Sequence, residues 1–243
     1  MRSSSVEAIV LKVLDYGEAD VIATLYTREQ GKLRGIAPNA RRSRKRFGGA
    51  LDLFARLNIS LRIREGLSRL EEAAIITLSS HIREDITKVA HAGYACELTD
   101  LLLPDGLPNS RYYRLLSAWL ERLNSSPPSP ADRLFFEINT LNILGYRPEL
   151  AQCSVCGVPF DGTRPLTFHP SAHAITCRFC AGAGRPVAPS VPERLRSCLV
   201  TGRFGTVVFT TEELADAGFI LDNLIIAHTG KEPKSLRFLR EVE

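Results

Sequence analysis

The sequence lacks any apolar run long enough to cross a membrane, and it lacks an apolar leader at its start. None of its hydrophobic stretches approaches the roughly 18–20 residues that a spanning helix requires. Residues 1–7 do not contain the hydrophobic core of a secretory signal. We therefore expect a soluble, cytoplasmic protein. Thiols stay reduced in that compartment, so paired cysteines there indicate a metal site more often than disulfides.

Motifs of the common enzyme classes are missing as well. The sequence contains no Gly-x-x-x-x-Gly-Lys-Ser/Thr loop, no Gly-x-Gly-x-x-Gly, no His-Glu-x-x-His and no Gly-x-Ser-x-Gly. Two acidic pairs, Glu71-Glu72 and Glu212-Glu213, consist of sequence neighbours, which point apart in strands and helices. We expect them to be ordinary surface pairs, and we expect the protein not to be an enzyme.

Basic residues are distributed unevenly along the 243-residue chain. The formal net charge is +4, but residues 1–80 contain 14 Lys and Arg against 9 Asp and Glu, a net charge of +5. The other 163 residues contain 17 basic and 18 acidic side chains, a net charge of −1. The first third is therefore the better candidate for a surface that binds a polyanion.

The first 79 residues show the patterns of short β-strands. Runs of β-branched and aliphatic residues alternate with turn residues, and they predict strands at residues 7–14, 21–27, 32–37, 51–64 and 68–74. The fourth run would place one apolar set on a single face: Leu51, Leu53, Ala55, Leu57, Ile59, Leu61 and Ile63. Five short strands in about 75 residues fit a small closed barrel, most commonly an OB-fold.

From residue 80 the apolar spacing becomes helical. A first helix is expected to extend to Pro104, and a second to cover residues 112–123. The third has clear boundaries, with Ser129 as N-cap, proline in its first turn and Gly145 as C-cap. Further helices are expected at places marked by a cap or an apolar repeat: Ser190, Thr211, and Leu236 with Leu239.

Two Cys-x-x-Cys pairs, Cys153-Ser-Val-Cys156 and Cys177-Arg-Phe-Cys180, are separated by 20 residues. Each pair can aim two thiolates at one point, and two pairs supply the four sulfurs of a tetrahedral Zn²⁺ site. Such a closed site leaves no position for water or substrate, so its metal would be structural rather than catalytic. Two disulfides, four free thiols, or a module that no longer binds metal are the alternatives.

The other cysteines and the nearby histidines are expected to play smaller parts. Cys96 and Cys198 stand among apolar residues of predicted helices, where a thiol behaves as a small hydrophobic group. Residues 166–169 and 173–176 would form a hairpin between the two cysteine pairs. His169 and His173 at its tip are not needed as ligands because four cysteines are present.

A basic loop lies between two predicted strands. It has five cations in six residues: Arg41, Arg42, Arg44, Lys45 and Arg46. On a barrel such a loop offers phosphate contacts whose affinity falls with salt. Lys32 and Arg34 on the preceding strand would extend that surface, and Phe47 would add a stacking residue. No base-reading element is evident, so contacts to the nucleic-acid backbone are expected. The alternative is a solvated run of charges.

Several segments together resemble one family, the bacterial recombination mediator RecO. They are Ala8-Ile-Val-Leu-Lys12, Asp15-Tyr-Gly-Glu-Ala-Asp20, Thr27-Arg-Glu-Gln-Gly-Lys32, Phe47-Gly-Gly-Ala-Leu51, Leu144-Gly-Tyr-Arg-Pro-Glu-Leu150 and His228-Thr-Gly-Lys-Glu-Pro-Lys-Ser235. These segments are spread over nearly the whole chain, and their order and spacing make the resemblance specific.

The resemblance implies a non-enzymatic role in recombinational DNA repair, in a bacterial cytoplasm and near the nucleoid. Such proteins bind single- and double-stranded DNA and anneal complementary strands. With RecR they help load RecA onto single strands covered by single-strand-binding protein, whose acidic C-terminal tail would dock on the helical domain. Lys234 and Ser235 match a family motif to which the resemblance gives no role.

By position, the resemblance assigns two sets of site residues. The structural Zn²⁺ ligands would be Cys153, Cys156, Cys177 and Cys180. The residues facing DNA would be Lys32, Arg34, Arg41, Arg42, Arg44, Lys45 and Arg46.

The expected fold class is α+β and multidomain, with an N-terminal OB-fold β-barrel, an all-α helical domain and an inserted four-cysteine zinc module. The barrel would cover residues 1–79, the helical domain residues 80–150 and 189–243, and the zinc insertion residues 151–188. Three alternatives stay open: an OB/zinc module that binds RNA or is associated with transcription, a zinc hydrolase, and a scaffold that binds only proteins. A hydrolase would need an open metal position.

Overall fold

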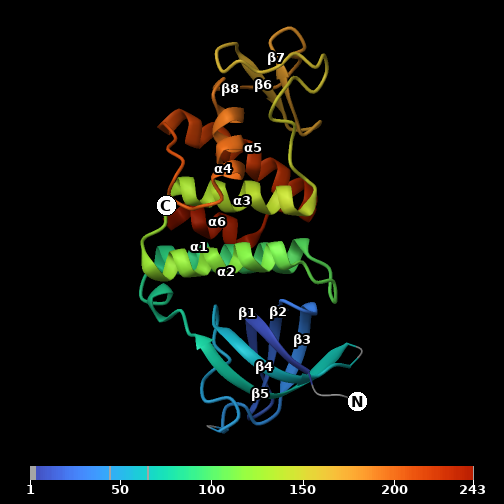
Figure 1. Ribbon diagram of the computed structural model, residues 1–243, viewed down its shortest axis with the longest axis vertical. Helices are drawn as coiled ribbons and strands as arrows, with labels where there is room; N and C mark the ends of the chain where they lie inside the picture. The colour runs from blue at the N-terminus through green and yellow to red at the C-terminus, as the bar shows by residue number, and fades with distance from the viewer. Residues whose placement is uncertain (1–3, 44, 65, 243) are drawn as a thin grey trace. The chain divides into compact units, whose positions relative to one another are not determined.

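The structure is a computed structural model that describes residues 4–43, 45–64 and 66–242 (Figure 1). The chain forms two compact units. The first consists of Met1–Pro127 with Pro233–Glu243, and the second consists of Pro128–Glu232. The domain boundaries predicted from the sequence stay a prediction, because compact packing alone does not test where domains begin and end.

The first unit begins with a closed β-barrel. Its strands are β1 (Ser4–Tyr16), β2 (Asp20–Thr27), β3 (Gly31–Ala37), β4 (Arg56–Arg62) and β5 (Leu67–Thr77). They are hydrogen-bonded in the order β1-β2-β3-β5-β4, and β4 pairs with β1 to close the barrel. All pairs are antiparallel except the short parallel pair of β3 and β5. This order is that of an OB-fold, so the predicted fold class is confirmed.

The barrel core follows the predicted alternation only in part. Leu57, Ile59 and Leu61 are fully buried in the barrel core, as the period-two pattern predicts. The predicted strand over residues 51–64 is too long, however, because β4 begins only at Arg56. Phe54 has a left-handed backbone (φ 68°), which breaks an extended strand. Backbone bonds at Phe54 and Ala55 reach Val10 of β1 instead.

Helices of the first unit follow the barrel. They are the short 3₁₀-helix η1 (Ser80–Ile82), α1 (Ile86–Leu102), α2 (Ser110–Ser125) and, from the end of the chain, α6 (Lys234–Val242), which packs on α1. The first helix begins six residues later than predicted. Asp85 is its N-cap, and the Asp85 carboxylate accepts hydrogen bonds from the N–H groups of Thr87 and Lys88.

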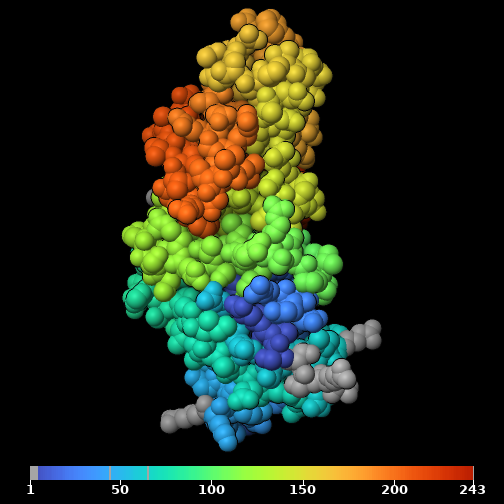
Figure 2. Space-filling view, viewed as in Figure 1, coloured from blue at the N-terminus to red at the C-terminus, as the bar shows by residue number. Residues whose placement is uncertain are grey.

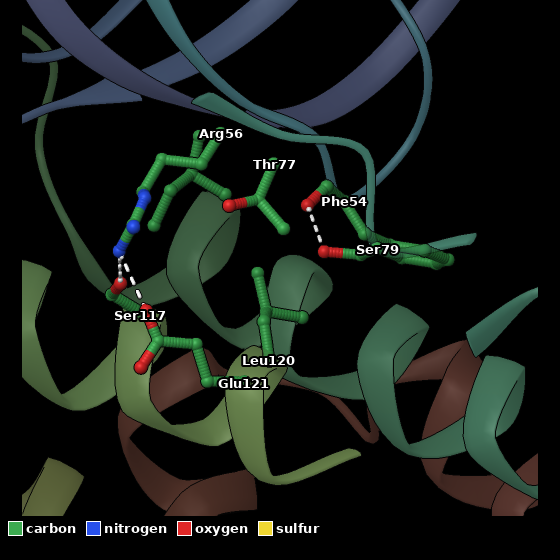
Figure 3. A pocket seen from close by; sticks show the side chains of 8 residues that line it. Phe54, Arg56, Thr77, Ser79, Ser117, Leu120 and Glu121 are labelled. Atoms are coloured by element: carbon green, nitrogen blue, oxygen red, sulfur yellow. Dashed lines mark hydrogen bonds and ion pairs between the residues drawn. The ribbon is translucent and has the colours of Figure 1, made fainter. Parts of the chain in front are cut away.

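Helix α2 packs on the barrel through aromatic rings and one arginine. Tyr26 of β2 lies edge-on to Tyr112 at 5.6 Å between ring centroids and stacks on Tyr113 at 6.2 Å. Arg56 donates to Ser117 Oγ (2.8 Å) and Glu121 Oε1 (2.7 Å), beside a small cavity (Figure 3).

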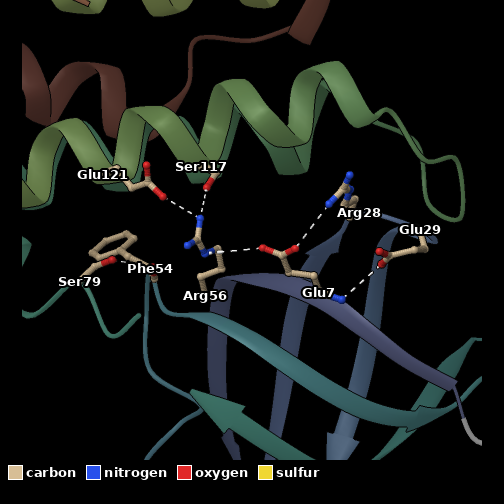
Figure 4. A network of polar contacts seen from close by, with 8 residues as sticks. All are labelled: Glu7, Arg28, Glu29, Phe54, Arg56, Ser79, Ser117 and Glu121. Atoms are coloured by element: carbon tan, nitrogen blue, oxygen red, sulfur yellow. Dashed lines mark hydrogen bonds and ion pairs between the residues drawn. The ribbon is translucent and has the colours of Figure 1, made fainter. Parts of the chain in front are cut away.

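The Arg56 guanidinium also joins a wider network of polar contacts on the barrel. Its Nε lies 3.6 Å from Glu7, and Arg28 lies 3.8 Å from the same carboxylate (Figure 4). The Glu7 N–H donates to Glu29. Arg56 is therefore a structural cation of this unit.

The second unit combines helices with a small sheet. Its helices are α3 (Pro130–Leu144), α4 (Val191–Thr201) and α5 (Thr211–Thr229), and α3 packs on both others. Strands β6 (Leu166–His169), β7 (Ala174–Cys177) and β8 (Arg185–Val187) form a sheet in the order β7-β6-β8. The predicted hairpin is confirmed, and so are the caps of α3: Ser129 Oγ accepts from the Asp132 N–H, and Gly145 is left-handed.

Two predictions about α4 and α5 are wrong, and a third holds only for the position of the cap. The α5 N-cap is Thr210 rather than Thr211, in a capping box with Glu213. Ser190 is the N-cap residue of α4, as predicted, but its side chain makes no capping hydrogen bond, and its Oγ donates to Glu213 at 2.6 Å instead. Glu213 is buried, so Glu212-Glu213 is not an ordinary surface pair.

Among the described residues, no helix combines the length and apolar character that crossing a bilayer requires.

Candidate nucleic-acid interface and metal centre

One part of the outer surface of the barrel sheet carries several exposed residues, and a bulge in β1 determines which side chains of that strand it presents. The register of β1 against β2 shifts between Val10 and Lys12, so that Lys12, Leu14 and Tyr16 point outward while Val13 packs against the core. Leu14 is 49% and Tyr16 is 56% exposed. Strand pairing arranges the outward residues in two rows, Lys12–Thr24–Arg34–Leu67 and Leu14–Ile22–Ile36–Arg69. We call these rows, together with Tyr16, the open face.

The open face carries cations and aliphatic side chains side by side. Lys12, Arg34 and Arg69 are all exposed. Beside Arg34, a groove of about 270 Å³ is lined by several residues that include Arg64 and Ser68 of the β4–β5 region. Exposed cations along a barrel groove provide the electrostatic attraction that a nucleic-acid backbone needs.

The basic loop lies against the turn between β1 and β2, at the edge of the open face. The Arg41 N–H donates to the Ala19 carbonyl (3.1 Å), and the Asn39 N–H donates to Asp20 Oδ1 (2.8 Å). Arg41 pairs with Asp15 at 3.2 Å, and Arg42 lies 3.7 Å from Glu18. Both ion pairs are well exposed and hence weak.

The cations predicted in the loop differ in their surroundings. Arg41, Arg42 and Lys45 are exposed, whereas Arg44 lies outside the described residues. Arg46 is half-buried and donates to the Pro38 carbonyl (2.7 Å) and the Ser43 hydroxyl (3.4 Å), so it shapes the loop from within.

Phe47 does not provide the predicted stacking surface. It is 2% exposed and belongs to the barrel core. The Arg46 guanidinium lies 5.2 Å from its ring centroid. The prediction of an aromatic platform at Phe47 is therefore wrong, because the chain uses this ring to close the end of the barrel.

Lys32 also makes contacts within the protein rather than facing solvent. It is 7% exposed, and its Nζ lies 2.5 Å from the Asp100 carbonyl, 3.1 Å from Asp100 Oδ1 and 3.3 Å from Asp105 Oδ1. These contacts connect β3 to the end of α1 and to the residues that follow it. The predicted DNA contact at Lys32 stays a prediction, but its charge is already neutralised, and we leave it out of the interface proposed below.

Sequence reasoning missed Lys12, Arg64 and Arg69. None of them belongs to the basic run of residues 41–46, and strand pairing brings Arg69 beside Ile36 and Lys12 beside Thr24, next to Arg34. The only signal in the sequence was the excess of basic residues over residues 1–80. The outward position of Lys12 depends on the β1 bulge, and that of Arg69 depends on the pairing of β3 with β5; no local sequence pattern predicts either feature.

The cysteine module, residues 151–188, lies at the surface of the second unit (yellow to orange in Figure 2). Its four paired cysteines form the cluster: the sulfur atoms of Cys153, Cys156, Cys177 and Cys180 all lie within 4.8 Å of one another. Two tight turns bring them together. The Gly157 N–H donates to the Cys153 carbonyl (2.9 Å), and the Cys180 N–H donates to the Cys177 carbonyl (3.0 Å). Gly157 has φ 72°, a conformation that favours glycine.

The chemistry of the cluster suits a metal ion. The Sγ atoms of Cys156 and Cys177 are 3.7 Å apart, far beyond the roughly 2.05 Å of a disulfide bond. Burial raises the pKa of Cys153, but N–H groups of Cys156, Cys177 and Val155 outweigh it and bring the pKa to about 6. A thiolate is the form of cysteine that binds metals. Four sulfurs around one point could hold a metal ion.

The remaining cysteines and the module histidines lie outside this cluster. Cys96 and Cys198 are buried, as predicted. His169 Nε2 hydrogen-bonds to Thr176 Oγ1 at 3.0 Å, and His173 adopts φ 52° at the tip of the hairpin. Within the part of the chain that the structure describes, neither histidine joins the four sulfurs.

Lys234 and Ser235 have a clear structural role. The N–H groups of both residues donate to the Glu97 carboxylate, at 3.1 and 2.7 Å, and the Ser235 hydroxyl donates to it as well. Glu97 of α1 thus satisfies N–H groups at the start of α6, which otherwise have no partner within that helix. This motif fixes the C-terminal helix of the first unit on α1.

Comparison with known proteins assigns the chain to a family. Residues 1–78 match the family model "Recombination protein O N terminal", and residues 83–237 match "Recombination protein O C terminal". A DNA repair protein RecO from Geobacter metallireducens is 48% identical over 243 residues, covering 100% of this chain and 99% of that protein. Proteins of the same name from Geobacter sulfurreducens (48% over 238 residues, 97% of each chain) and Pelobacter propionicus (44% over 243 residues, 100% and 98%) are also similar.

Proposed function

The chain belongs to the recombination protein O family and therefore serves in DNA repair and recombination; from this premise we propose that its barrel binds single- and double-stranded DNA and anneals complementary strands. One observation carries the proposal. The open face and the basic loop adjoin each other, and together they present six exposed cations: Lys12, Arg34, Arg41, Arg42, Lys45 and Arg69. A surface of this kind binds the phosphates that both forms of DNA share.

The proposed mechanism is electrostatic. Two DNA strands repel each other through their phosphates, and cations that neutralise both strands lower that repulsion. Contacts to the backbone leave base edges free, so complementary bases can pair while the strands are held. The annealing step breaks no covalent bond, and we propose that the protein is not an enzyme.

We further propose that the metal is Zn²⁺, held by Cys153, Cys156, Cys177 and Cys180 in a closed structural site. Four sulfur ligands complete the tetrahedral coordination that Zn²⁺ prefers, and they leave no position for a reacting water. The metal would stabilise the fold of the cysteine module and take no part in strand annealing.

The partners are proposed from family membership. RecR would act with this protein in loading RecA, and the acidic C-terminal tail of single-strand-binding protein would dock on its helical part. RecA would be reached indirectly, through the single strand that these proteins clear.

The annealing rate of complementary oligonucleotides tests this function. The loop variant Arg41→Ala/Arg42→Ala/Lys45→Ala removes three exposed cations without touching Arg46, which shapes the loop. We expect the variant to anneal at least tenfold more slowly, because each lost phosphate contact weakens the hold on both strands.

The matched control removes the same charge from the second unit, through Arg147→Ala/Arg203→Ala/Lys231→Ala, all exposed positions. The control should anneal like the wild type. Equal rates in the loop variant and the wild type would contradict the proposal. Tighter binding of structured RNA than of DNA by the wild type would replace it with an RNA-binding function.

A further inference from the structure

One aromatic ring is exposed among the described residues of the barrel. Tyr26, Phe47 and Phe54 are buried, at 0%, 2% and 4% exposure, whereas Tyr16 is 56% exposed. Of the four aromatic side chains in the described part of the barrel (residues 4–43, 45–64 and 66–77), Tyr16 is therefore the one that is exposed. The other outward apolar residues of the open face are aliphatic, so stacking of an aromatic ring against a base would have to involve Tyr16.

The position of Tyr16 relates this ring to the basic loop. Tyr16 ends β1 and pairs with Asp20 across the turn, and the Asp20 carboxylate accepts from the Asn39 N–H. The neighbouring Asp15 pairs with Arg41, and Glu18 lies 3.7 Å from Arg42. Arg41 and Arg42 of the basic loop thus contact acidic residues on either side of Tyr16 in the sequence, which places the ring beside the loop.

Folding alone gives little reason for this arrangement. A tyrosine that is more than half exposed at the end of a strand buries little apolar surface, and Leu14, two positions earlier on the same face, is also about half exposed. An exposed ring beside a basic loop is instead typical of a single-strand binding surface, where bases stack on aromatic rings and cations contact the backbone.

We propose that Tyr16 stacks on one unpaired base of the bound strand and thereby makes the barrel prefer single-stranded to double-stranded nucleic acid. In a duplex the bases are stacked on each other, so the ring has no base face to contact and only the phosphate contacts remain. One ring anchors one base and leaves its neighbours free to pair. The inference rests on the proposed DNA binding and specifies which form of DNA this site selects.

The test compares the affinities of Tyr16→Ala, Tyr16→Phe and wild type for a single-stranded oligonucleotide and for the matching duplex. Tyr16→Ala should bind the single strand at least about fivefold more weakly, the lower end of what one base–aromatic stack provides. Its affinity for the duplex should stay within twofold of wild type. Tyr16→Phe keeps the ring and should restore single-strand binding.

Two further measurements separate stacking from other roles. The salt dependence of binding should be the same in Tyr16→Ala and wild type, because no charge is removed. Ile75→Ala, a control that truncates another exposed apolar residue of the barrel, should bind both DNAs as the wild type does.

The inference would be overturned if Tyr16→Ala lost as much affinity for the duplex as for the single strand. It would also be overturned if Tyr16→Phe lost as much affinity for the single strand as Tyr16→Ala does. Unchanged binding in Tyr16→Ala would also overturn it and would leave Tyr16 to a protein partner. Failure of the proposed function itself gives a different result: the wild type would then bind neither DNA in a salt-dependent way.

Discussion

Lys32 and Arg34 stand two positions apart on β3 and point to the same side of the barrel, yet their surroundings differ. Lys32 is covered by residues at the end of α1 and just beyond, where Asp100 and Asp105 neutralise its charge. Arg34 lies between Thr24 and Leu67 on the open face. The sequence around these two residues does not distinguish a buried cation from an exposed one, because the acidic residues that pair with Lys32 come about 70 residues later in the chain. Charge type predicts a surface only where burial and partners are known.

This contrast gives a prediction for two single variants. Lys32→Ala should lower the free energy of unfolding by about 2 kcal/mol, because it removes a buried stem and leaves two carboxylates without their cation. Arg34→Ala should change stability by less than about 0.5 kcal/mol. It should instead weaken DNA binding and reduce the salt slope by about 0.7 for one lost single-strand phosphate contact. Urea unfolding measures the stability of each variant, and a salt titration measures its DNA binding. A loss of DNA binding without a loss of stability in Lys32→Ala, or a loss of stability without a loss of DNA binding in Arg34→Ala, would contradict the prediction.

At the scale of elements, predictions based on local signals mostly succeeded, with the α5 cap placed one residue too late, and those that needed tertiary contacts did not. The boundaries of α3 follow from Ser129 and Gly145, whose capping groups lie within the segment itself. The start of β4 was placed wrongly, because Phe54 and Ala55 bond to Val10, a contact remote in sequence.

The candidate site divides in the same way. Cysteine spacing predicted the sulfur cluster, since each pair is local. The open face needed the register of four strands, so Lys12 and Arg69 could not be found from the sequence. Phe47 was misassigned because its burial depends on how the barrel closes.

The cap of α5 gives a prediction that depends on pH. Burial raises the pKa of Glu213, but hydrogen bonds from Ser190, the Thr210 N–H and Arg194 outweigh it and hold the pKa below its ordinary value of 4.5. A carboxyl whose pKa is lower in the folded state stabilises the fold above the unfolded pKa, and this contribution disappears as pH falls through the folded pKa. Glu213→Gln should therefore lower the free energy of unfolding by about 1–3 kcal/mol at pH 7.

The difference in the free energy of unfolding between Glu213→Gln and the wild type should become smaller as the pH is lowered from 4.5. Urea unfolding at a series of pH values measures it. Glu212→Gln is the matched control, because Glu212 is the exposed neighbour in the same helical turn, and it should behave like the wild type throughout. If the loss of stability in Glu213→Gln were the same at every pH, the role proposed for the ionised carboxylate would be contradicted.

For the whole molecule, the two candidate sites belong to different compact units. The open face and basic loop lie in the unit that contains Met1–Pro127, and the four sulfurs lie in Pro128–Glu232. The excess positive charge follows the same division, since the first unit has 22 basic and 17 acidic residues (net +5) and the second has 9 and 10 (net −1). DNA binding and metal binding should therefore be separable.

Removal of the metal tests that separation. Chelation, or the double variant Cys153→Ser/Cys177→Ser, should lower the thermal stability of the second unit, because the energy of metal binding contributes to folding. Affinity for DNA and its salt dependence should stay within twofold of the wild type. A variant with an intact barrel, judged by hydrogen exchange, that no longer binds DNA would show that the cysteine module takes part in binding.

The central claim is that the open face and the basic loop bind DNA through its phosphates, and the most direct test is the slope of log affinity against log salt for a single strand. Three proteins are compared: wild type, the loop variant, and a variant that adds Lys12→Ala, Arg34→Ala and Arg69→Ala. We predict that the slope falls in steps, by about 0.7 for each phosphate contact removed. A slope that is the same in all three proteins would contradict the account.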